Sequence, residues 1–239
     1  MPLPFLILET GTPVMPMRRH GGFPHWIRVA AGLRDEKTRV VDATAGALPR
    51  ARGHAGILVT GSGAMVSDRE PWSEATSGWL RAAVEDGVPV FGICYGHQLL
   101  AHAFGGRVAD NPAGREMGTI EVVPTPAAAG DPLFGDASAP FRAQATHLQS
   151  VLEPPAGAVL LARTALDACA AFRLGEQAWG VQFHPEFSAR HMQGYIAARA
   201  PTLRAEGHDP IAMHAAVRSA PVARAILRQF IRHASRRHG

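Results

Sequence analysis

Two short stretches carry residue types that could together perform nucleophilic chemistry. Gly92-Ile93-Cys94-Tyr95-Gly96 places a cysteine at a turn between an apolar run and a helix. This is the G-x-S-x-G elbow pattern with sulfur in place of oxygen, and its small flanking residues let strand and helix approach. A helix N-terminus beside the sulfur favours the thiolate over the thiol. Cys94 is therefore a candidate nucleophile, although a free cysteine in a short motif is more often a small core residue.

The second stretch, Gln182-Phe183-His184-Pro185-Glu186, supplies the groups that such a thiol needs. In an extended chain residues i and i+2 point the same way, so His184 and Glu186 share a face, and Pro185 stiffens that arrangement. The imidazole can take the proton from the sulfur while the carboxylate holds the tautomer of the ring. Together with Cys94, these residues predict a Cys-His-Glu triad.

Alternating strands and helices are predicted to position the two stretches. Buried apolar runs predict strands, and amphipathic runs between them predict helices. We expect strands over residues 4–9, 39–43, 55–60 and 88–93, and helices over residues 25–33, 71–86 and 95–104. This alternation predicts a parallel sheet that is covered by helices on both faces.

Two connecting segments could contact a ligand. The turn Gly61-Ser62-Gly63 follows the third predicted strand and has little side chain to keep a ligand from its backbone N–H groups. The loop over residues 10–24 follows the first strand and contains Arg18-Arg19-His20. A loop in that position lies near the C-terminal edge of a parallel sheet, where ligands bind.

The second half of the chain has a different pattern. Short alternating runs predict an antiparallel meander with strands over residues 118–123, 141–145, 159–163, 168–174 and 178–183. Helices are predicted over residues 190–199 and 211–233, with a break at Ala200-Pro201 and a junction at Ala220-Pro221. His184 thus lies just beyond the last strand of the meander.

The composition is that of a globular chain. Of 239 residues, 46% are hydrophobic and 18% are charged. The two cysteines, Cys94 and Cys169, give no disulfide framework. The N-terminal apolar run lacks a basic region and is too short for a signal peptide, and no run is long enough to span a bilayer. We therefore expect a cytoplasmic protein that does not enter the membrane.

The charge pattern bears on partners and cofactors. The formal charge is +4, carried almost entirely by scattered arginines. The basic end over residues 224–239 predicts an amphipathic helix with a solvated basic face, and no nucleic-acid-binding signature accompanies it. No H-x-x-x-H, C-x-x-C or Gly-Lys phosphate-loop pattern occurs in the sequence. We expect no nucleic-acid partner, no metal and no other cofactor.

Three motifs together resemble the class I glutamine amidotransferase family. They are Phe91–Leu100 around the cysteine, Gln182–Glu186 around the histidine, and Val59–Gly63 at the position of the family's glycine-rich oxyanion loop. They occur in the family's order and spacing, over about residues 4–200. The resemblance implies a flavodoxin-like three-layer α/β sandwich.

The resemblance also implies a role for each candidate catalytic residue. Cys94 would be the nucleophile, His184 the base and Glu186 the group that orients the base. The tetrahedral oxyanion would be bound by the backbone N–H of Tyr95 and by one from the Gly61-Ser62-Gly63 turn, foremost that of Ser62.

Substrate contacts follow from the same resemblance. Gln98 matches the family position that contacts the substrate amino acid, and Thr146-His147 matches the segment whose backbone binds its carboxylate end. The sequence departs from the family at two places. The oxyanion turn is Gly-Ser-Gly where many members have Gly-Gly-Pro, and Leu148-Gln149 stands where several members carry an acidic residue. Both departures leave the triad intact and leave the acyl donor open.

Three functions remain open at this point. The implied reaction is attack of the Cys94 thiolate on a γ-carboxamide carbonyl, giving a γ-glutamyl thioester that water hydrolyses. The chain could hydrolyse glutamine or another small γ-glutamyl compound unaided. It could instead be the glutaminase subunit of a GMP-synthase-like amidotransferase and pass ammonia to a separate synthetase. Alternatively, it could be a non-catalytic binding protein on the same scaffold.

The domain organisation favours the first of these functions. We predict that residues 1–200 form the amidotransferase-like catalytic domain and that residues 201–239 form a helical extension packed on it. The apolar faces of the extension must be buried, because a long exposed apolar stripe favours aggregation. The extension leaves no room for a synthetase, so unaided hydrolysis without ATP is favoured over a partner-dependent function.

Overall fold

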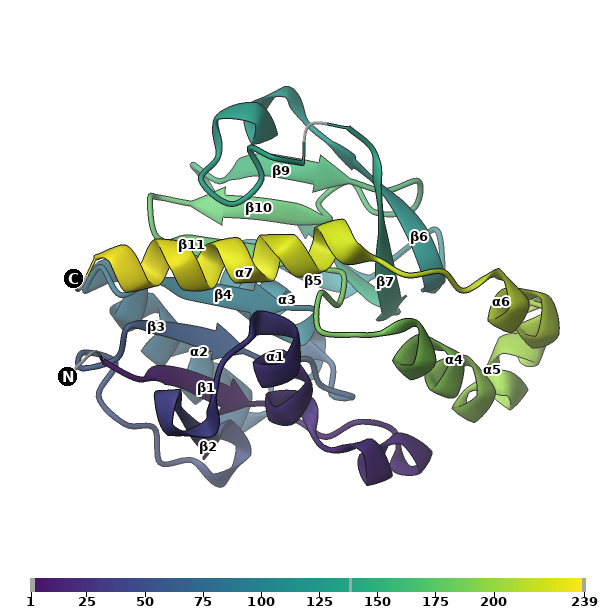
Figure 1. The fold of residues 1–239 in the computed structure, drawn as a ribbon, viewed down its shortest axis with the longest axis horizontal. Coiled ribbons are helices and arrows are strands. Elements are labelled where there is room, and N and C mark those ends of the chain that lie inside the picture. The colour runs from purple at the N-terminus through teal and green to yellow at the C-terminus, as the bar shows by residue number, and fades with distance from the viewer. Residues whose placement is uncertain (1–2, 138, 238–239) are drawn as a thin grey trace.

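A computed structural model describes residues 3–137 and 139–237 of the chain. A nine-stranded sheet runs through its centre in the order β2-β1-β3-β4-β11-β10-β9-β6-β7, and β5 pairs with β8 in a second sheet (Figure 1). Residues 1–2 of the predicted catalytic domain and residues 238–239 of the predicted C-terminal extension lie outside the described residues.

The elements follow the predicted alternation closely. The strands are β1 (Phe5–Glu9), β2 (Thr38–Asp42), β3 (Gly56–Val59), β4 (Val90–Ile93), β5 (Arg107–Asp110), β6 (Glu116–Pro124), β7 (Phe141–His147), β8 (Gln149–Glu153), β9 (Val159–Arg163), β10 (Ala171–Leu174) and β11 (Ala178–Val181). The α-helices are α1 (Phe23–Ala31), α2 (Pro71–Glu85), α3 (Tyr95–Ala103), α4 (Ala189–Ala198), α5 (Ala200–Ala205), α6 (Pro210–Ala216) and α7 (Pro221–Arg236).

The central sheet changes from parallel to antiparallel pairing at β11. Neighbouring strands from β2 to β11 run parallel, whereas those from β11 through β10, β9 and β6 to β7 run antiparallel. This topology confirms the prediction of a mostly parallel α/β sheet with an antiparallel meander. β11 is therefore the strand at which the parallel half meets the antiparallel half.

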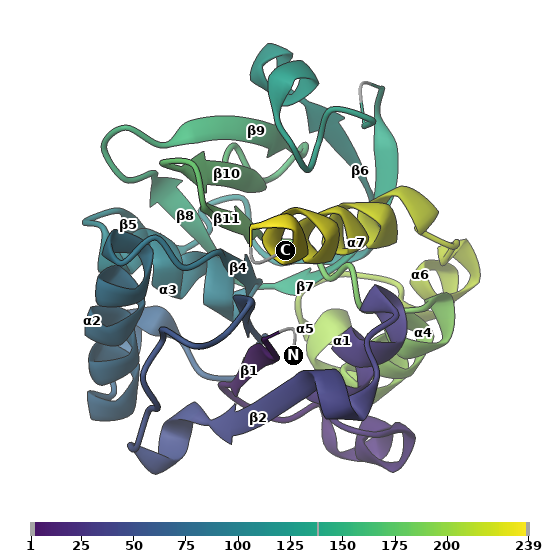
Figure 2. The ribbon, with the colours of Figure 1, turned by 60° about the vertical axis from the view of Figure 1, so that its left-hand side comes forward.

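Helices cover both faces of the sheet, as the alternating pattern predicts. In β1, Phe5 and Ile7 point into one hydrophobic core, and Leu6 and Leu8 point into the other. The helices α1 and α7 close the first core, and α2 and α3 close the second (Figure 2). Burial on both faces explains why the parallel strands are continuous apolar runs.

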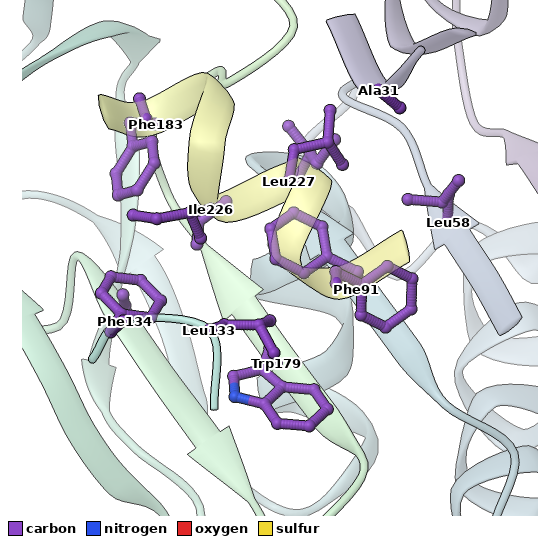
Figure 3. Close-up of a cluster of buried hydrophobic side chains, with 14 of the residues drawn as sticks. Ala31, Leu58, Phe91, Leu133, Phe134, Trp179, Phe183, Ile226 and Leu227 are labelled. Carbon is purple, nitrogen blue, oxygen red and sulfur yellow. The ribbon is translucent and has the colours of Figure 1, made fainter. Parts of the chain in front are cut away.

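The C-terminal helix α7 forms part of one of the two helical layers. Ile226, Leu227 and Phe230 are buried in the first core, together with side chains of the central strands (Figure 3). The Phe230 ring centroid lies 5.2 Å from that of Phe91 on β4 and 6.3 Å from that of Trp179 on β11. The helix thus packs directly on the two strands that lead into the predicted triad. The division of the chain at residue 200 stays a prediction.

The helices α4, α5 and α6 lie together beyond one end of the sheet (Figure 1). A third apolar cluster holds α4 and α5 against the start of α1. It contains Met192 and Tyr195 from α4, Leu203 from α5 and Phe23 from α1. Ala200 and Pro201 begin the helix α5 directly after Arg199, because a proline in the first turn of a helix lacks an N–H that would have no partner there anyway. None of the described helices combines the length and the apolar character needed to cross a membrane.

Candidate active site

Cys94 occupies a strained turn between β4 and α3. Its φ of 52° and ψ of −101° place it outside the regions that L-residues favour, and Arg69 is the one other described non-glycine residue with positive φ. Its backbone N–H donates to the carbonyl of Val181 at 2.8 Å, which extends the β4–β11 pairing by one residue. Strain of this kind costs of order 1–3 kcal/mol and is typical of functional positions.

The flanking glycines are required by close packing. A Cβ on Gly96 would lie 2.7 Å from the carbonyl oxygen of Val59 on β3, and Gly92 is similarly close to the backbone of Gly96. The N–H of Gly96 donates to the carbonyl of Thr60 at 3.2 Å. The first turn of α3 is therefore pressed against β3 and against the glycine-rich turn that follows it.

His184 and Glu186 follow β11, which is hydrogen-bonded to β4 with Val181 opposite Ile93. Nδ1 of His184 lies 2.8 Å from Oε1 of Glu186, and both side chains are almost fully buried. The other ring nitrogen, Nε2, is buried and has no hydrogen-bond partner among residues 3–137 and 139–237. The side chain of Cys94 is close enough for its charge to act on this ring. The structure therefore brings the three predicted residues together in the order Cys-His-Glu.

The surroundings of His184 favour its protonated form. Burial lowers the pKa, but the charges of Glu186 and Cys94 outweigh burial and raise the pKa of His184 to about 10. The ring stacks on Phe187, with centroids 4.2 Å apart, and the backbone N–H of His184 donates to the carbonyl of Gln144 at 2.8 Å. An imidazolium beside the sulfur would stabilise a thiolate.

The glycine-rich turn lies directly beside the reacting side chains. A Cβ on Gly61 would lie 3.0 Å from Cε1 of His184 and 3.8 Å from Cβ of Cys94. The turn is anchored by Thr10, whose hydroxyl donates to the carbonyl of Thr60 at 3.0 Å and whose N–H donates to Thr60 Oγ1 at 3.0 Å. The backbone of this turn is therefore fixed against β1 before any substrate binds.

Both predicted oxyanion donors lie beside Cys94. Tyr95 is the first residue of α3, where backbone N–H groups have no partner within the helix. The hydroxyl of Ser62 accepts a bond from the N–H of Ala64 at 3.1 Å, so this side chain turns back on its own loop. Gly63 has open space around it. The Ser62 hydroxyl is therefore engaged within its own loop.

A small cavity of about 80 Å³ adjoins Cys94 on the side of α3. Its lining includes Ser62, Gly63, Cys94, Tyr95, Gln98, Arg115, Thr146, His147, Leu148, Gln149 and Arg199. The Gln98 amide donates to the carbonyl of Gln149 at 2.7 Å and to Oε1 of Gln182 at 3.0 Å, which fixes its orientation. The hydroxyl of Thr146 is buried without a partner among the described residues. All the predicted substrate-contact positions are thus gathered at one cavity.

The ring of His147 is engaged in the fold and not in the cavity. Its Nε2 lies 3.1 Å from Oε2 of Glu116, and its Nδ1 lies 3.0 Å from the carbonyl of Gln149. The other oxygen of Glu116 accepts a bond from Thr164 at 2.7 Å. This buried network holds β6, β7 and the start of β8 together, so the ring of His147 is already engaged and contributes to the fold.

A second cavity, of about 220 Å³, adjoins His184 and shares Ser62, Gly63, Thr146 and Arg199 with the first. Its lining includes Arg18, Phe23, His184, Tyr195 and Arg199, and sequence reasoning did not assign a role to the two arginines. Arg18 had a positional signal, because it lies in the loop after the first strand. Arg199 had none, because the end of an ordinary helix carries no motif.

Comparison with known families supports this arrangement. The family model described as glutamine amidotransferase class-I matches residues 20–200. Those residues contain the elbow, the glycine-rich turn and the His-x-Glu segment.

Curated relatives include both a hydrolase and amidotransferase components. A glutamine-hydrolyzing GMP synthase subunit of Halobacterium salinarum is 32% identical over 178 residues, covering 73% of this chain and 89% of that protein. A gamma-glutamyl-L-1-hydroxyisopropylamide hydrolase of a Pseudomonas species is 31% identical over 160 residues, covering 64% of this chain but 54% of that protein. GMP synthase of Aeropyrum pernix is 37% identical over 153 residues, and the match covers 64% of this chain but 27% of that protein.

Solved structures share the fold over nearly the whole chain. A glutamine amidotransferase from Thermotoga maritima aligns with a TM-score of 0.76 and 20% identity, covering 97% of this chain and 98% of that one. A glutamine amidotransferase from Methylobacillus flagellatus aligns with a TM-score of 0.75 and 24% identity, covering 97% and 95%. The flavodoxin-like α/β sandwich predicted for residues 4–200 is confirmed, and the likeness extends through α7.

Proposed function

This chain belongs to the class I glutamine amidotransferase family, and we propose that it hydrolyses a γ-glutamyl amide bond through a thioester on Cys94. The observation that carries the proposal is the strained Cys94 elbow beside a buried His184, whose Nδ1 lies 2.8 Å from Oε1 of Glu186. A strained cysteine is retained in a fold when the surroundings impose it and function uses it.

The first half of the proposed reaction forms the thioester. The Cys94 thiolate attacks the γ-carbonyl carbon, and a C–S bond forms as the carbonyl oxygen takes up negative charge. His184, held protonated beside Glu186, gives its Nε2 proton to the leaving nitrogen as the C–N bond breaks. The leaving group departs as ammonia or an amine, and the glutamyl group remains on sulfur.

Backbone donors would stabilise the tetrahedral intermediate. The N–H groups of Tyr95 and of the Gly61-Ser62-Gly63 turn would flank the carbonyl, and the Thr10–Thr60 bonds hold that turn in place. Loss of one such donor typically lowers the rate by about 10²–10³. Because the donors are fixed before binding, little reorganisation is needed during the reaction.

The second half of the proposed reaction hydrolyses the thioester and frees Cys94. Neutral His184 takes a proton from water, the water oxygen attacks the thioester carbon, and the C–S bond breaks. Glutamate is released, and the Cys94–His184 pair returns to its starting state. The glutamyl group would lie in the small cavity, between Gln98 and the backbone of Thr146-His147.

A second candidate function is that of a glutaminase subunit that passes ammonia to a separate synthetase. The name of the Halobacterium relative, a GMP synthase subunit, favours it, because this chain covers 89% of that protein. The chemistry at Cys94 is the same in both cases. The two functions differ only in the fate of the leaving nitrogen and in the need for a partner.

The deciding experiment is an assay of the purified chain alone. Glutamate release is measured from glutamine and from a series of γ-glutamyl dipeptides, without ATP. Release from at least one substrate supports the unaided hydrolase. Release that requires both ATP and an added synthetase supports the glutaminase function. No release and no adduct with a glutamine-type electrophile would support a non-catalytic binding protein and contradict the proposal.

A further inference from the structure

The two cavities share Ser62, Gly63, Thr146 and Arg199 in their linings, but each reaches a different member of the reacting pair. The cavity of about 80 Å³ is lined by Cys94 and Gln98 but not by His184, whereas the cavity of about 220 Å³ is lined by His184 but not by Cys94. In the proposed reaction the acyl carbon bonds to Cys94, and His184 protonates the leaving nitrogen. The larger cavity, which we call the leaving-group cavity, therefore receives the departing amine.

The leaving-group cavity is larger than ammonia requires. A water molecule, which is similar in size to ammonia, occupies about 30 Å³ of the liquid. A cavity of about 220 Å³ has room for an amine with several further heavy atoms. Val14, Phe23 and Tyr195 add apolar surface to its walls. The cavity is therefore larger than ammonia alone needs.

Two arginines line the leaving-group cavity, and no aspartate or glutamate is among its lining residues. Arg18 donates from Nε to the carbonyl of Pro13 at 2.9 Å, a bond that orients the guanidinium without neutralising it. Arg199 lies between α4 and α5, and its Nε is buried with no hydrogen-bond partner among the described residues. Both side chains therefore bring uncompensated positive charge to the space beside His184.

Arg115 and Arg199 differ in whether an acidic residue pairs with them. Arg115 lines the smaller cavity, as Arg199 also does, but its guanidinium binds the Glu206 carboxylate through three bonds, at 2.8, 2.9 and 3.1 Å. Arg199 forms no ion pair within the described part of the chain, although the charge of Arg115 is close enough to act on it. Burial and then Arg115 lower the pKa of Arg199, so this cation lies where a bound anion would relieve it.

We infer that the preferred substrates are γ-glutamyl amides whose leaving amine carries a carboxylate, as in γ-glutamyl amino acids, and that Arg18 and Arg199 bind that carboxylate. The inference rests on the proposed function and specifies its substrate class. A planar guanidinium can bind a carboxylate through two parallel bonds, which gives orientation as well as affinity. The carboxylate would hold the scissile nitrogen next to Nε2 of His184.

The test compares two substrates that differ in one charge, γ-glutamylalanine and γ-glutamylalaninamide. We expect the wild-type chain to hydrolyse the acid with a kcat/KM about 10- to 100-fold above that of the amide. This ratio corresponds to the usual contribution of hydrogen bonds to a charged group. Arg18→Gln and Arg199→Gln should each lower kcat/KM for the acid toward that of the amide. In Arg18→Gln, hydrolysis of the amide and of glutamine should change little. In Arg199→Gln, whose side chain also lines the smaller cavity, hydrolysis of these two substrates should fall less than hydrolysis of the acid.

Two controls separate this effect from a general loss of structure. Arg19→Gln removes a neighbouring exposed arginine that does not line the cavity, and it should leave the acid-to-amide ratio unchanged. Arg199→Lys keeps the charge and should restore part of the ratio. The melting temperature of each variant is measured to confirm that the fold is retained.

Binding to the Cys94→Ala variant provides a readout without turnover. The acid should bind it more tightly than the amide, measured by calorimetry, and Arg18→Gln in that background should remove the difference. Equal binding and equal hydrolysis of the two substrates would overturn the inference and leave the proposed function standing. Equal losses on both substrates in Arg199→Gln, with Arg18→Gln unaffected, would place Arg199 on the glutamyl half and also overturn it. If the wild-type chain hydrolyses neither substrate and forms no electrophile adduct, the proposed function itself fails.

Discussion

Gly92 and Gly96 face each other so closely that a Cβ on Gly92 would lie 2.4 Å from the carbonyl oxygen of Gly96. Backbone cannot move away as a flexible side chain can, so any larger residue at position 92 must displace the start of α3. The strand and the helix that hold Cys94 are therefore locked together by two residues that contribute no chemistry.

We predict that Gly92→Ala lowers the free energy of unfolding by about 2 kcal/mol or more, the range of overpacked cores. Urea denaturation measures the loss. Gly78→Ala is the matched control, because Gly78 lies exposed within α2 and has open space around it. That change should raise stability by roughly 0.5–1 kcal/mol, since alanine favours helix over glycine. Similar losses at both positions would contradict the close approach described above.

The two cysteines should differ sharply in reactivity. Burial, and then the charge of Asp167, raise the pKa of Cys169 to about 12, so its thiol is inert at neutral pH. A glutamine-type electrophile should therefore add once to the wild-type chain and to Cys169→Ala, and not at all to Cys94→Ala. Intact-protein mass spectrometry reads the adduct. Labelling that persists in Cys94→Ala would refute the assignment of the nucleophile.

Strain at Cys94 predicts a stability gain on its removal. Glycine adopts a φ of 52° with a ψ of −101° more readily than any residue with a Cβ. Cys94→Gly should therefore be inactive yet more stable than Cys94→Ala, by about 1–3 kcal/mol. Paired thermal melts of the two variants test this expectation. Equal melting temperatures would mean that the elbow is not strained.

Glu186→Gln tests the orienting carboxylate. The substitution keeps the shape of the side chain but removes the charge that stabilises the imidazolium. We expect kcat to fall by about 10²–10⁴, against roughly 10⁶ for Cys94→Ala, because the imidazole remains in place. Steady-state kinetics on a substrate that the wild-type chain hydrolyses give both values. Equal losses at the two positions would show that Glu186 does more than orient His184.

The pH dependence of stability follows from the raised pKa of His184. The unfolded chain releases this proton near pH 6.5, whereas the folded chain holds it until about pH 10. The contribution of His184 to the free energy of unfolding is therefore complete below pH 6.5 and is lost as the pH rises through about 10. Urea denaturation at several pH values between these limits measures the free energy of unfolding. This free energy should fall more steeply with pH for the wild-type chain than for Glu186→Gln, and equal slopes would count against the ion pair.

The parts predicted from sequence are those whose signals are local. Continuous apolar runs identify the parallel strands because both faces of each strand are buried, and the turn pattern places Cys94 at the end of one of them. The strands β5 and β8 went unpredicted. The exposed ends and half-buried middle of β5 give neither a continuous apolar run nor a clear alternation.

The charges around the site could not be predicted from the sequence. Arg18 and Arg199 are far apart in the chain and meet only because α1, α4 and the loop after β1 share one apolar cluster. No spacing rule connects residues that tertiary packing brings together. The extent of the C-terminal helix was predictable from its amphipathic pattern, but its position across β4 and β11 was not, because the pattern does not say which surface it covers.

The pairing of β4 with β11 sets the order in which the molecule should fail on heating. Cys94 and His184 are carried by adjacent central strands, and opening that ladder requires the whole sheet to come apart. Arg18 lies in a short 3-10 helix (Met15–His20), and Arg199 at the junction of two short outer helices. Segments of this kind open at lower free energy than the core. Discrimination between charged and neutral leaving groups is therefore expected to disappear at a lower temperature than hydrolysis itself. A warmed sample would become an indiscriminate catalyst before it became an inactive one.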